Sequence, residues 1–235
     1  MSLKIIPKIF SYPSPDKGED AFATNSDSGF FAISDGATDS NYSKEWADLL
    51  VNNFIQSGFE LKTKNIATWV GPIQKKWYDA VPWEILQEKG DGYFNKAQKG
   101  GFATLLGIII DEQNALTAFA VGDSNIFIMR DDALIVKFPV EESKSFGTGP
   151  KLIGSMAKNE LSINSLCYKL EKNDLIFLAT DAFSKWFMKQ DEEKLFPWMD
   201  LINLEDQDDF KIFMNKIKDV WNQNDDDITL MILRM

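Results

Sequence analysis

Runs of apolar residues separated by short polar turns predict most of the strands in this chain. Nine segments combine strand-like length with many β-branched or aromatic residues. These segments are 4–10, 21–25, 29–34, 103–111, 115–121, 125–130, 133–138, 174–180 and 228–234. The four in the middle are separated by "DEQN", "GDSN" and "DDA". Such residues are typical of hairpin turns, so we expect each of these four strands to pair antiparallel with the next.

Apolar residues at intervals of three and four predict helices in three further regions. The clearest is 206–221, which carries Phe210, Phe213, Met214 and Ile217 on one face. A second helix is expected over 43–57, and a third over 65–88 with interruptions at its two prolines. Strands in hairpins with helices grouped around them indicate a layered α+β domain rather than alternating βαβ units.

Composition narrows the chemistry that this chain can perform. The 235 residues carry 25 lysines and arginines against 36 acids, a formal charge of −11, which argues against a nucleic-acid partner. With no histidine and a single cysteine, imidazole-based catalysis and cysteine zinc sites are excluded. We read Cys167 as a buried, inert thiol. Catalysis would therefore depend on carboxylates, lysines, hydroxyls or bound ions.

Hydropathy predicts a protein of the cytoplasm. The first 18 residues lack the apolar core and the cleavage pattern of a secretory signal. The longest apolar stretch, 102–110, is far too short to span a membrane. We therefore expect a cytoplasmic protein with no membrane partner. The 235 residues are sufficient for a single domain.

Acidic residues stand at the ends of four predicted strands. Asp35 and Asp181 follow strands, whereas the pair Glu19-Asp20 and the run 225–227 precede them. In an antiparallel sheet the end of one strand adjoins the start of its neighbour, so these acids can meet at one edge. Clustered carboxylates need cations, and all-oxygen ligation favours Mg²⁺ or Mn²⁺ over Ca²⁺. Taken singly, each acid is also an ordinary turn or helix-cap residue.

Five blocks of sequence together resemble a known family. They read "GEDAF", "FFAISDGA", "GFATLLGIII…AFAVGDSNIF", "DLIFLATDAF" and "DDITLMIL" and span residues 18–233. Their order and spacing resemble the metal-dependent protein phosphatase 2C (PPM) family, in a divergent, bacterial-type form. The resemblance implies two antiparallel sheets packed as a sandwich with helices on the outer faces. It also implies one catalytic domain over 1–235, with a flap at about 139–165.

The resemblance further implies a serine/threonine protein phosphatase that acts on phosphoprotein substrates. Two Mg²⁺ or Mn²⁺ ions would generate a bridging hydroxide that attacks the phosphorus. Asp35 would bridge the ions and Asp20 would share in holding them, which makes these two the catalytic residues. The full set of metal-binding residues that it implies is Asp20, Asp35, the Gly36 carbonyl, Asp181, Asp226 and, through water, Glu19.

Several positions depart from the family pattern. Pro15 stands where members usually carry a phosphate-binding arginine, and Lys17 nearby could supply a point charge instead. Ala37 replaces a histidine that some members use as a general acid, so metal-bound water would have to protonate the leaving group. Lysine and glycines at 99–101 replace an acid tied to a third ion, so we expect no third ion. Asp123 is interpreted as a hairpin-turn acid and is not assigned to the metals.

Two other functions compete with the phosphatase hypothesis. The loss of the arginine motivates a catalytically inactive pseudophosphatase that binds a phosphoprotein or another partner through the same fold. A calcium-binding domain could use "DQDD" and "DDD", although neither run has the spacing of an EF-hand loop. Metal-stimulated turnover separates the first alternative from an enzyme.

Overall fold

The computed structural model describes residues 5–12, 18–38, 42–147, 149–157, 161–217 and 226–235. Two five-stranded sheets dominate the fold, and every strand pair in them is antiparallel. The first sheet has the order β1-β12-β11-β7-β8. Its strands are β1 (Lys8–Tyr12), β7 (Asn125–Arg130), β8 (Ala133–Phe138), β11 (Leu175–Ala179) and β12 (Ile228–Arg234). We call this sheet the A sheet.

The second sheet, called the B sheet, has the order β10-β6-β5-β3-β2. Its strands are β2 (Ala21–Asn25), β3 (Phe30–Ser34), β5 (Leu105–Ile110), β6 (Ala115–Val121) and β10 (Asn164–Lys169). A separate two-stranded ribbon joins β4 (Phe102–Ala103) to β9 (Ile153–Gly154). The bridge between Gly36 and Ala103 connects this ribbon to the end of β3.

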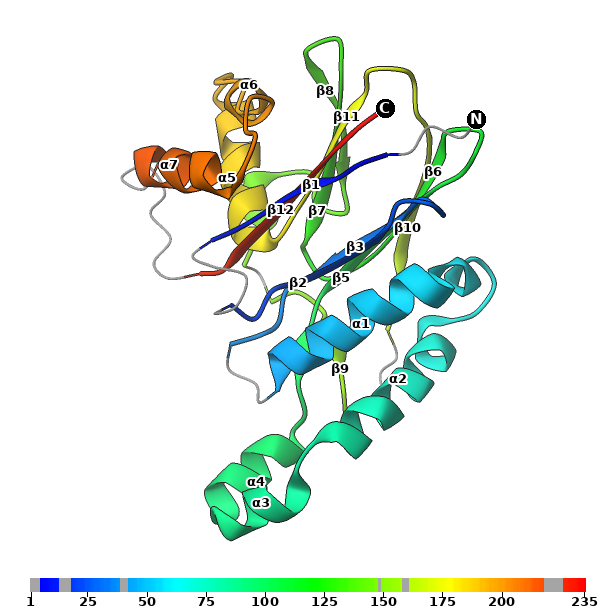
Figure 1. The fold of residues 1–235 in the computed structure, drawn as a ribbon, viewed down its shortest axis with the longest axis vertical. Coiled ribbons are helices and arrows are strands. Elements are labelled where there is room, and N and C mark those ends of the chain that lie inside the picture. The colour runs from blue at the N-terminus through cyan, green and yellow to red at the C-terminus, as the bar shows by residue number, and fades with distance from the viewer. Residues whose placement is uncertain (1–4, 13–17, 39–41, 148, 158–160, 218–225) are drawn as a thin grey trace.

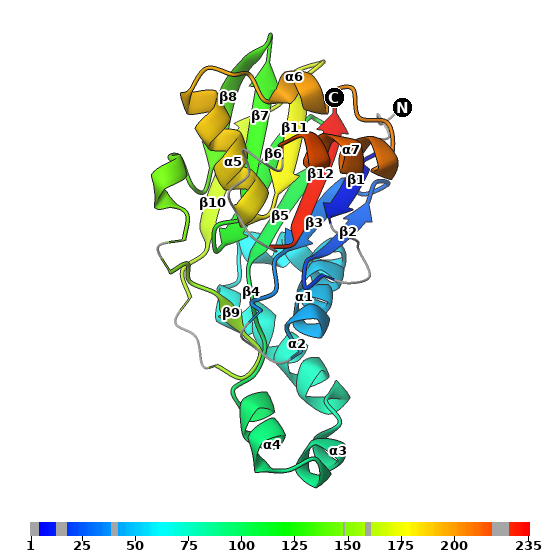
Figure 2. The same ribbon diagram turned by 90° about the vertical axis from the view of Figure 1, so that its left-hand side faces the viewer.

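Helices cover the outer face of each sheet (Figures 1 and 2). Helices α1 (Ser43–Ser57) and α2 (Ile66–Ala80) contribute to the apolar cluster on the B sheet. Helices α5 (Asp181–Glu192), α6 (Trp198–Leu201) and α7 (Gln207–Ile217) form a second cluster with the A sheet. A third cluster lies between the sheets and includes Phe31, Leu106, Ile126, Leu178 and Met231. The predicted sandwich with helices on both outer faces is therefore confirmed.

The three expected helices are present, with changes at their ends. The Asn65 side chain accepts a hydrogen bond from the Thr68 N–H at 2.8 Å and so caps α2. Helix α2 ends at Ala80 because Pro82 forces the residue before it into an extended conformation. The chain continues as α3 (Trp83–Glu88) and α4 (Asp91–Gln98), which project away from the sheets (Figure 2). The expected helix over 206–221 is observed to residue 217, and 218–221 lie outside the described residues.

The predicted hairpin at "GDSN" is wrong. Strand β6 pairs with β5 and β10 in the B sheet, whereas β7 pairs with β11 and β8 in the A sheet. Gly122 begins this connection with φ of +100°, a conformation that glycine adopts without strain. The connection therefore crosses from one sheet to the other, because β6 and β7 each bury their inner face in the core between the sheets.

The structure differs from the sequence prediction in three further respects: the bounds of the first strand, two elements that were not predicted, and the exposure of Cys167. The first strand was expected over 4–10 but is found at Lys8–Tyr12. Strand β10 and helix α5 were not predicted. Cys167 lies on β10 and is exposed, so its prediction as a buried thiol is wrong. The edge position of β10 explains this exposure, because its outer face has no covering helix among its described contacts.

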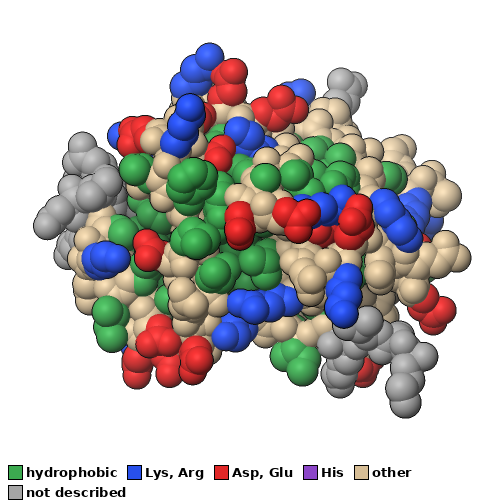
Figure 3. Space-filling model, turned by 90° about the horizontal axis from the view of Figure 1, so that it is seen from above, with side chains coloured by type: hydrophobic (Ala, Val, Ile, Leu, Met, Phe, Trp, Pro, Cys, Tyr) green, Lys and Arg blue, Asp and Glu red, His purple; other side chains and the backbone are tan. Residues whose placement is uncertain are grey.

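The surface combines apolar and charged side chains. Large hydrophobic side chains that are more than half exposed include Ile6, Phe59, Tyr93, Leu195 and Phe196. Figure 3 shows one face on which hydrophobic side chains gather near the middle, with acidic and basic side chains around them. Among the described helices, none has the length and hydropathy required to cross a membrane.

Candidate active site

The strand register brings the acidic strand ends to one end of the sandwich. In the B sheet, the first residue of β2 pairs with the last residue of β3, so Asp20 and Asp35 flank neighbouring ends. In the A sheet, the end of β11 pairs with Leu230 near the start of β12. Asp181 and Asp226 therefore also lie at neighbouring ends. The structure thus brings together the four aspartates that the sequence predicts, two from each sheet.

Asp20 is the most buried of these four acids, with 8% of its surface exposed. Its Oδ2 atom accepts a hydrogen bond from the Thr180 hydroxyl at 2.9 Å. Its Oδ1 atom is buried and has no hydrogen-bond partner among the residues that the structure describes. Burial raises the pKa of Asp20 to about 8, although the hydroxyls of Thr180 and Thr229 oppose that rise. A buried carboxylate oxygen without a partner is unfavourable unless a cation or water occupies its free side.

Asp35 is held by its backbone at the end of β3. Its N–H donates to the Thr104 hydroxyl at 2.9 Å, and its carbonyl accepts from the Thr104 N–H at 2.9 Å. Burial holds the pKa of Asp35 well above its usual value, and repulsion from Asp20, Asp181, Asp226 and Asp123 raises it further. The carboxylates next to both sheets therefore repel one another when they are ionised.

Asp181 is the first residue of α5 and lies beside this group. Burial raises the pKa of its carboxyl, with repulsion from Asp123 as the next cause. The Ala182 N–H, the Asp35 side chain and the charge of Lys185 act in the opposite direction. Burial also raises the pKa of Asp226 to about 6, and repulsion from Asp181 adds to this.

Glu19 and Gly36 lie next to these aspartates. The Glu19 N–H donates to Asp227 Oδ2 at 2.6 Å, and a Glu19 carboxylate oxygen accepts a hydrogen bond from the Ser43 hydroxyl. A Cβ atom on Gly36 would lie 2.7 Å from the Glu19 carbonyl oxygen. Glycine is therefore required at residue 36 for the two segments to approach this closely.

Asp123 is a fifth carboxylate at this end of the sandwich, and sequence reasoning missed it. It is 5% exposed, and burial raises its pKa, while the Gly147 N–H acts against the rise. Its place follows from the crossing between β6 and β7, which carries the residue between the sheets. The signal in the sequence was the apolar run 126–129 within β7 and the apolar end of β6, which indicate strands buried on both faces.

The donor set fits divalent cations that keep part of their water shell. Across the described part of the chain, no three acidic side chains are arranged to bind one ion directly. Mg²⁺ commonly takes one or two carboxylates and fills its remaining positions with water. The unpartnered oxygen of Asp20 and the mutual repulsion of the surrounding acids both favour such an ion. Lys17 and Pro15 fall outside the described residues.

A comparison with known protein families identifies the family to which this chain belongs. The sequence matches the protein phosphatase 2C family over residues 15–225. The chain belongs to the protein phosphatase 2C family. A comparison with curated proteins gives no match.

Solved structures of protein phosphatase 2C type share the fold of this chain. The serine/threonine phosphatase Stp1 from Staphylococcus aureus is 13% identical with a TM-score of 0.65, covering 98% of this chain and 95% of that one. The serine/threonine phosphatase PstP/Ppp of Mycobacterium tuberculosis is 11% identical with a TM-score of 0.63, covering 98% of each chain. The phosphatase domain of SpoIIE from Bacillus subtilis is 17% identical with a TM-score of 0.52, covering 98% of this chain and 92% of that one.

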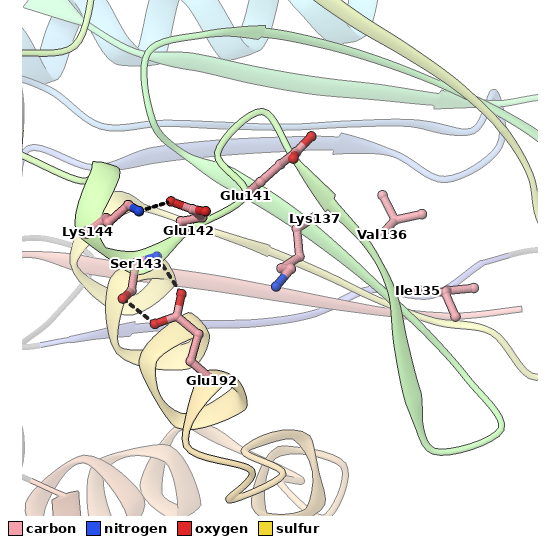
Figure 4. A pocket seen from close by; sticks show the side chains of 8 residues that line it. All are labelled: Ile135, Val136, Lys137, Glu141, Glu142, Ser143, Lys144 and Glu192. Carbon is pink, nitrogen blue, oxygen red and sulfur yellow. Dashed lines mark hydrogen bonds and ion pairs between the residues drawn. The ribbon is translucent and has the colours of Figure 1, made fainter.

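One groove of this phosphatase 2C family member lies away from the acids. It encloses about 750 Å³ between the edge strand β8, the loop with the short 3₁₀ helix η2 (Ser143–Ser145), and the last turn of α5. The Ser143 hydroxyl and N–H both donate to Glu192, and Lys144 pairs with Glu142 (Figure 4). Glu192 ends α5 and Asp181 begins it, so the groove and the acidic group lie at opposite ends of that helix.

Proposed function

We propose that this chain is a Mg²⁺- or Mn²⁺-dependent serine/threonine protein phosphatase that hydrolyses phosphomonoesters on phosphoproteins. The observation that carries the proposal is the buried, unpartnered Oδ1 atom of Asp20 at the point where carboxylates from both sheets meet. Family membership and the titles of the Stp1 and PstP structures, which name serine/threonine phosphatases, support the same reaction class.

In this proposal Asp20, Asp35, Asp181 and Asp226 hold two divalent ions together with the Gly36 carbonyl. Glu19 acts through water. When bound, the ions would supply an activated water molecule and the positive charge that phosphate hydrolysis requires. The fold contributes rigidity: Thr104 fixes the backbone of Asp35 through two hydrogen bonds, and Thr180 orients Asp20.

The proposal includes the remaining sequence-based expectations. The protein would act in the cytoplasm as one catalytic domain over 1–235. The segment at about 139–165 would form a flap beside the site. Within it the structure describes η2 and β9, and the Gly147 N–H acts on Asp123.

Hydrolysis of p-nitrophenyl phosphate tests the proposed reaction. Turnover should require Mn²⁺ or Mg²⁺ and should stop when the ions are chelated. Asp35→Asn should lower turnover by about a hundredfold or more, because the charge of a group that positions the nucleophile is removed. Asp91→Asn, which removes an exposed acid on α4, is the matched control and should retain full activity. Metal-independent turnover would contradict the proposal.

A second candidate function is a pseudophosphatase that binds a phosphoprotein without cleaving it. The proline at residue 15, where the family usually carries a phosphate-binding arginine, favours this alternative. A binding module would bind a phosphopeptide measurably and yet release no phosphate under any metal condition. Release of phosphate from the same peptide would exclude it.

A further inference from the structure

Lys185 lies one helical turn beyond Asp181 on α5. Helix α5 begins at Asp181, and residues four apart share one face of a helix. Side chains on a helix lean toward its N-terminus, so a long side chain at residue 185 extends back over the turn that contains Asp181. From this position the ammonium group of Lys185 can reach the acidic end of the sandwich.

The electrostatics of the site agree with this direction. The charge of Lys185 is one of the influences that lower the pKa of Asp181, against the rise that burial and Asp123 cause. Lys185 is exposed, and its ammonium group makes no hydrogen bond or ion pair with any residue that the structure describes. It is therefore a cation that acts on the acidic group and has no partner of its own in the described chain.

Lys44, by contrast, is already bound near the same site. Its ammonium group donates to the Asp20 carbonyl at 2.7 Å and to Asp48 at 3.2 Å. The first contact holds the segment before β2 against α1, the second lies within α1, and together they leave the lysine committed to the protein. Lys44 consequently offers less free charge to an incoming anion than Lys185 does.

A phosphomonoester carries two negative charges near neutral pH, and at this site it approaches at least five carboxylates. Bound ions would offset part of that repulsion, and an exposed cation beside the site would offset more. We propose that Lys185 binds the phosphate group of the substrate from the α5 side of the site. This inference rests on the proposed function, because it concerns the substrate of that reaction.

Lysine provides a compact charge on a flexible stem and lacks the planar fork with which arginine grips two phosphate oxygens. Lys185 should therefore contribute to phosphate binding without fixing the geometry of the reacting group. Its removal should weaken substrate binding and change the rate of the bound complex little. A KM effect with nearly constant kcat is the expected signature.

The test compares Lys185→Ala with Lys189→Ala, which removes another exposed lysine one turn further along α5. Binding of inorganic phosphate is measured by calorimetry at saturating Mg²⁺, and p-nitrophenyl phosphate gives KM and kcat. Lys185→Ala should weaken phosphate binding and raise KM by roughly five- to tenfold, as expected for a partly exposed charge contact. Lys185→Arg should restore most of the affinity, and Lys189→Ala should behave like the parent protein.

The affinity for Mg²⁺ provides a second readout, and it should not fall together with the phosphate affinity when Lys185 is replaced. Removing a positive charge beside the acids should leave Mg²⁺ affinity unchanged or slightly tighter, whereas general damage to the site would weaken it. Unchanged phosphate affinity in Lys185→Ala, or equal weakening in Lys189→Ala, would overturn the inference even if turnover is normal. A parent protein without turnover, in which Lys185→Ala still weakens phosphate binding, would uphold this inference and refute the proposed enzyme.

Discussion

The hydroxyl of Thr180, directly after β11 of the A sheet, donates a hydrogen bond to Oδ2 of Asp20, directly before β2 of the B sheet and 160 residues away in the sequence. The same hydroxyl oxygen accepts the Thr229 N–H at 3.0 Å. Thr180 therefore ties β12, the end of β11 and the start of β2 together at one atom. This contact fixes which way the Asp20 carboxylate faces.

Thr180→Val should impair the site while preserving its shape. Valine has the volume of threonine but no hydroxyl, so Oδ2 of Asp20 loses its donor. The variant should bind Mg²⁺ about tenfold more weakly and lose about 1–3 kcal/mol of stability, the cost of a buried acceptor left without a partner. Calorimetric Mg²⁺ titration and urea unfolding measure the two effects. Thr180→Ser keeps the hydroxyl, and a serine variant as impaired as the valine variant would contradict this account.

The stability of the metal-free protein should fall as pH rises. Asp20 has an ordinary pKa of 3.8 when unfolded, and burial raises it to about 8 in the fold. Folding therefore takes up a proton, and the stability present near pH 4 is lost as pH rises through 8. The pKa of Asp226 is raised to about 6, so its ionisation also lowers the stability as pH rises. Thermal melting in chelator at several pH values should show this decline.

Divalent ions should reverse that decline. A cation that binds the folded state stabilises it by mass action and compensates the ionised carboxylates. Adding Mg²⁺ should thus raise the melting temperature more at pH 8 than at pH 5. An equal rise in melting temperature at both pH values would show that the ions do not act on these acids.

Asp227 should act by positioning Glu19. It accepts the Glu19 N–H, and a Cβ atom on Gly18 would lie 2.7 Å from its carboxyl carbon. Asp227→Ala removes the acceptor and should lower both Mg²⁺ affinity and turnover several-fold, since Glu19 is no longer held in place. Asp227→Asn keeps an acceptor oxygen and should retain most of both. If asparagine is as harmful as alanine, charge rather than position is the cause.

Gly122→Ala should destabilise the crossing between the sheets. Gly122 has φ of +100°, and an added Cβ atom would lie 2.5 Å from the Thr104 Cγ2 atom. The substitution should cost about 1–3 kcal/mol in urea unfolding, because strain and a steric clash combine. Since Thr104 also binds the backbone of Asp35, activity should fall as well. Gly92→Ala, at an open position on α4, is the control and should be neutral or stabilising.

The sequence predicted the strands of the sandwich because their apolar runs are bounded by clear turn residues. Strand β10 was missed because it lies at a sheet edge and alternates exposed and half-buried residues over "NSLCYK", which leaves a weak apolar signal. Helix α5 was missed because it follows β11 after a single residue, and the acid at its first position was interpreted as the end of a strand.

The four aspartates could be predicted because each stands at the end of a clear strand, and strand ends meet in antiparallel sheets. Asp123 could not be placed in the same way. The turn composition "GDSN" is a local property, whereas the sheet that β7 joins depends on which long-range partners bury it. Local patterns alone therefore assign Asp123 to an exposed turn, and tertiary packing places it among the other acids.

The acids of this site lie next to strand ends of two separate sheets, so the apolar side chains between those sheets set how far apart the acids are. Leu106 and Ile128 belong to that filling, and neither touches solvent. Trimming or enlarging such a side chain alters how far apart the sheets stand. The separation of the carboxylates is consequently adjustable from within the hydrocarbon interior, by residues that lie outside the acidic group.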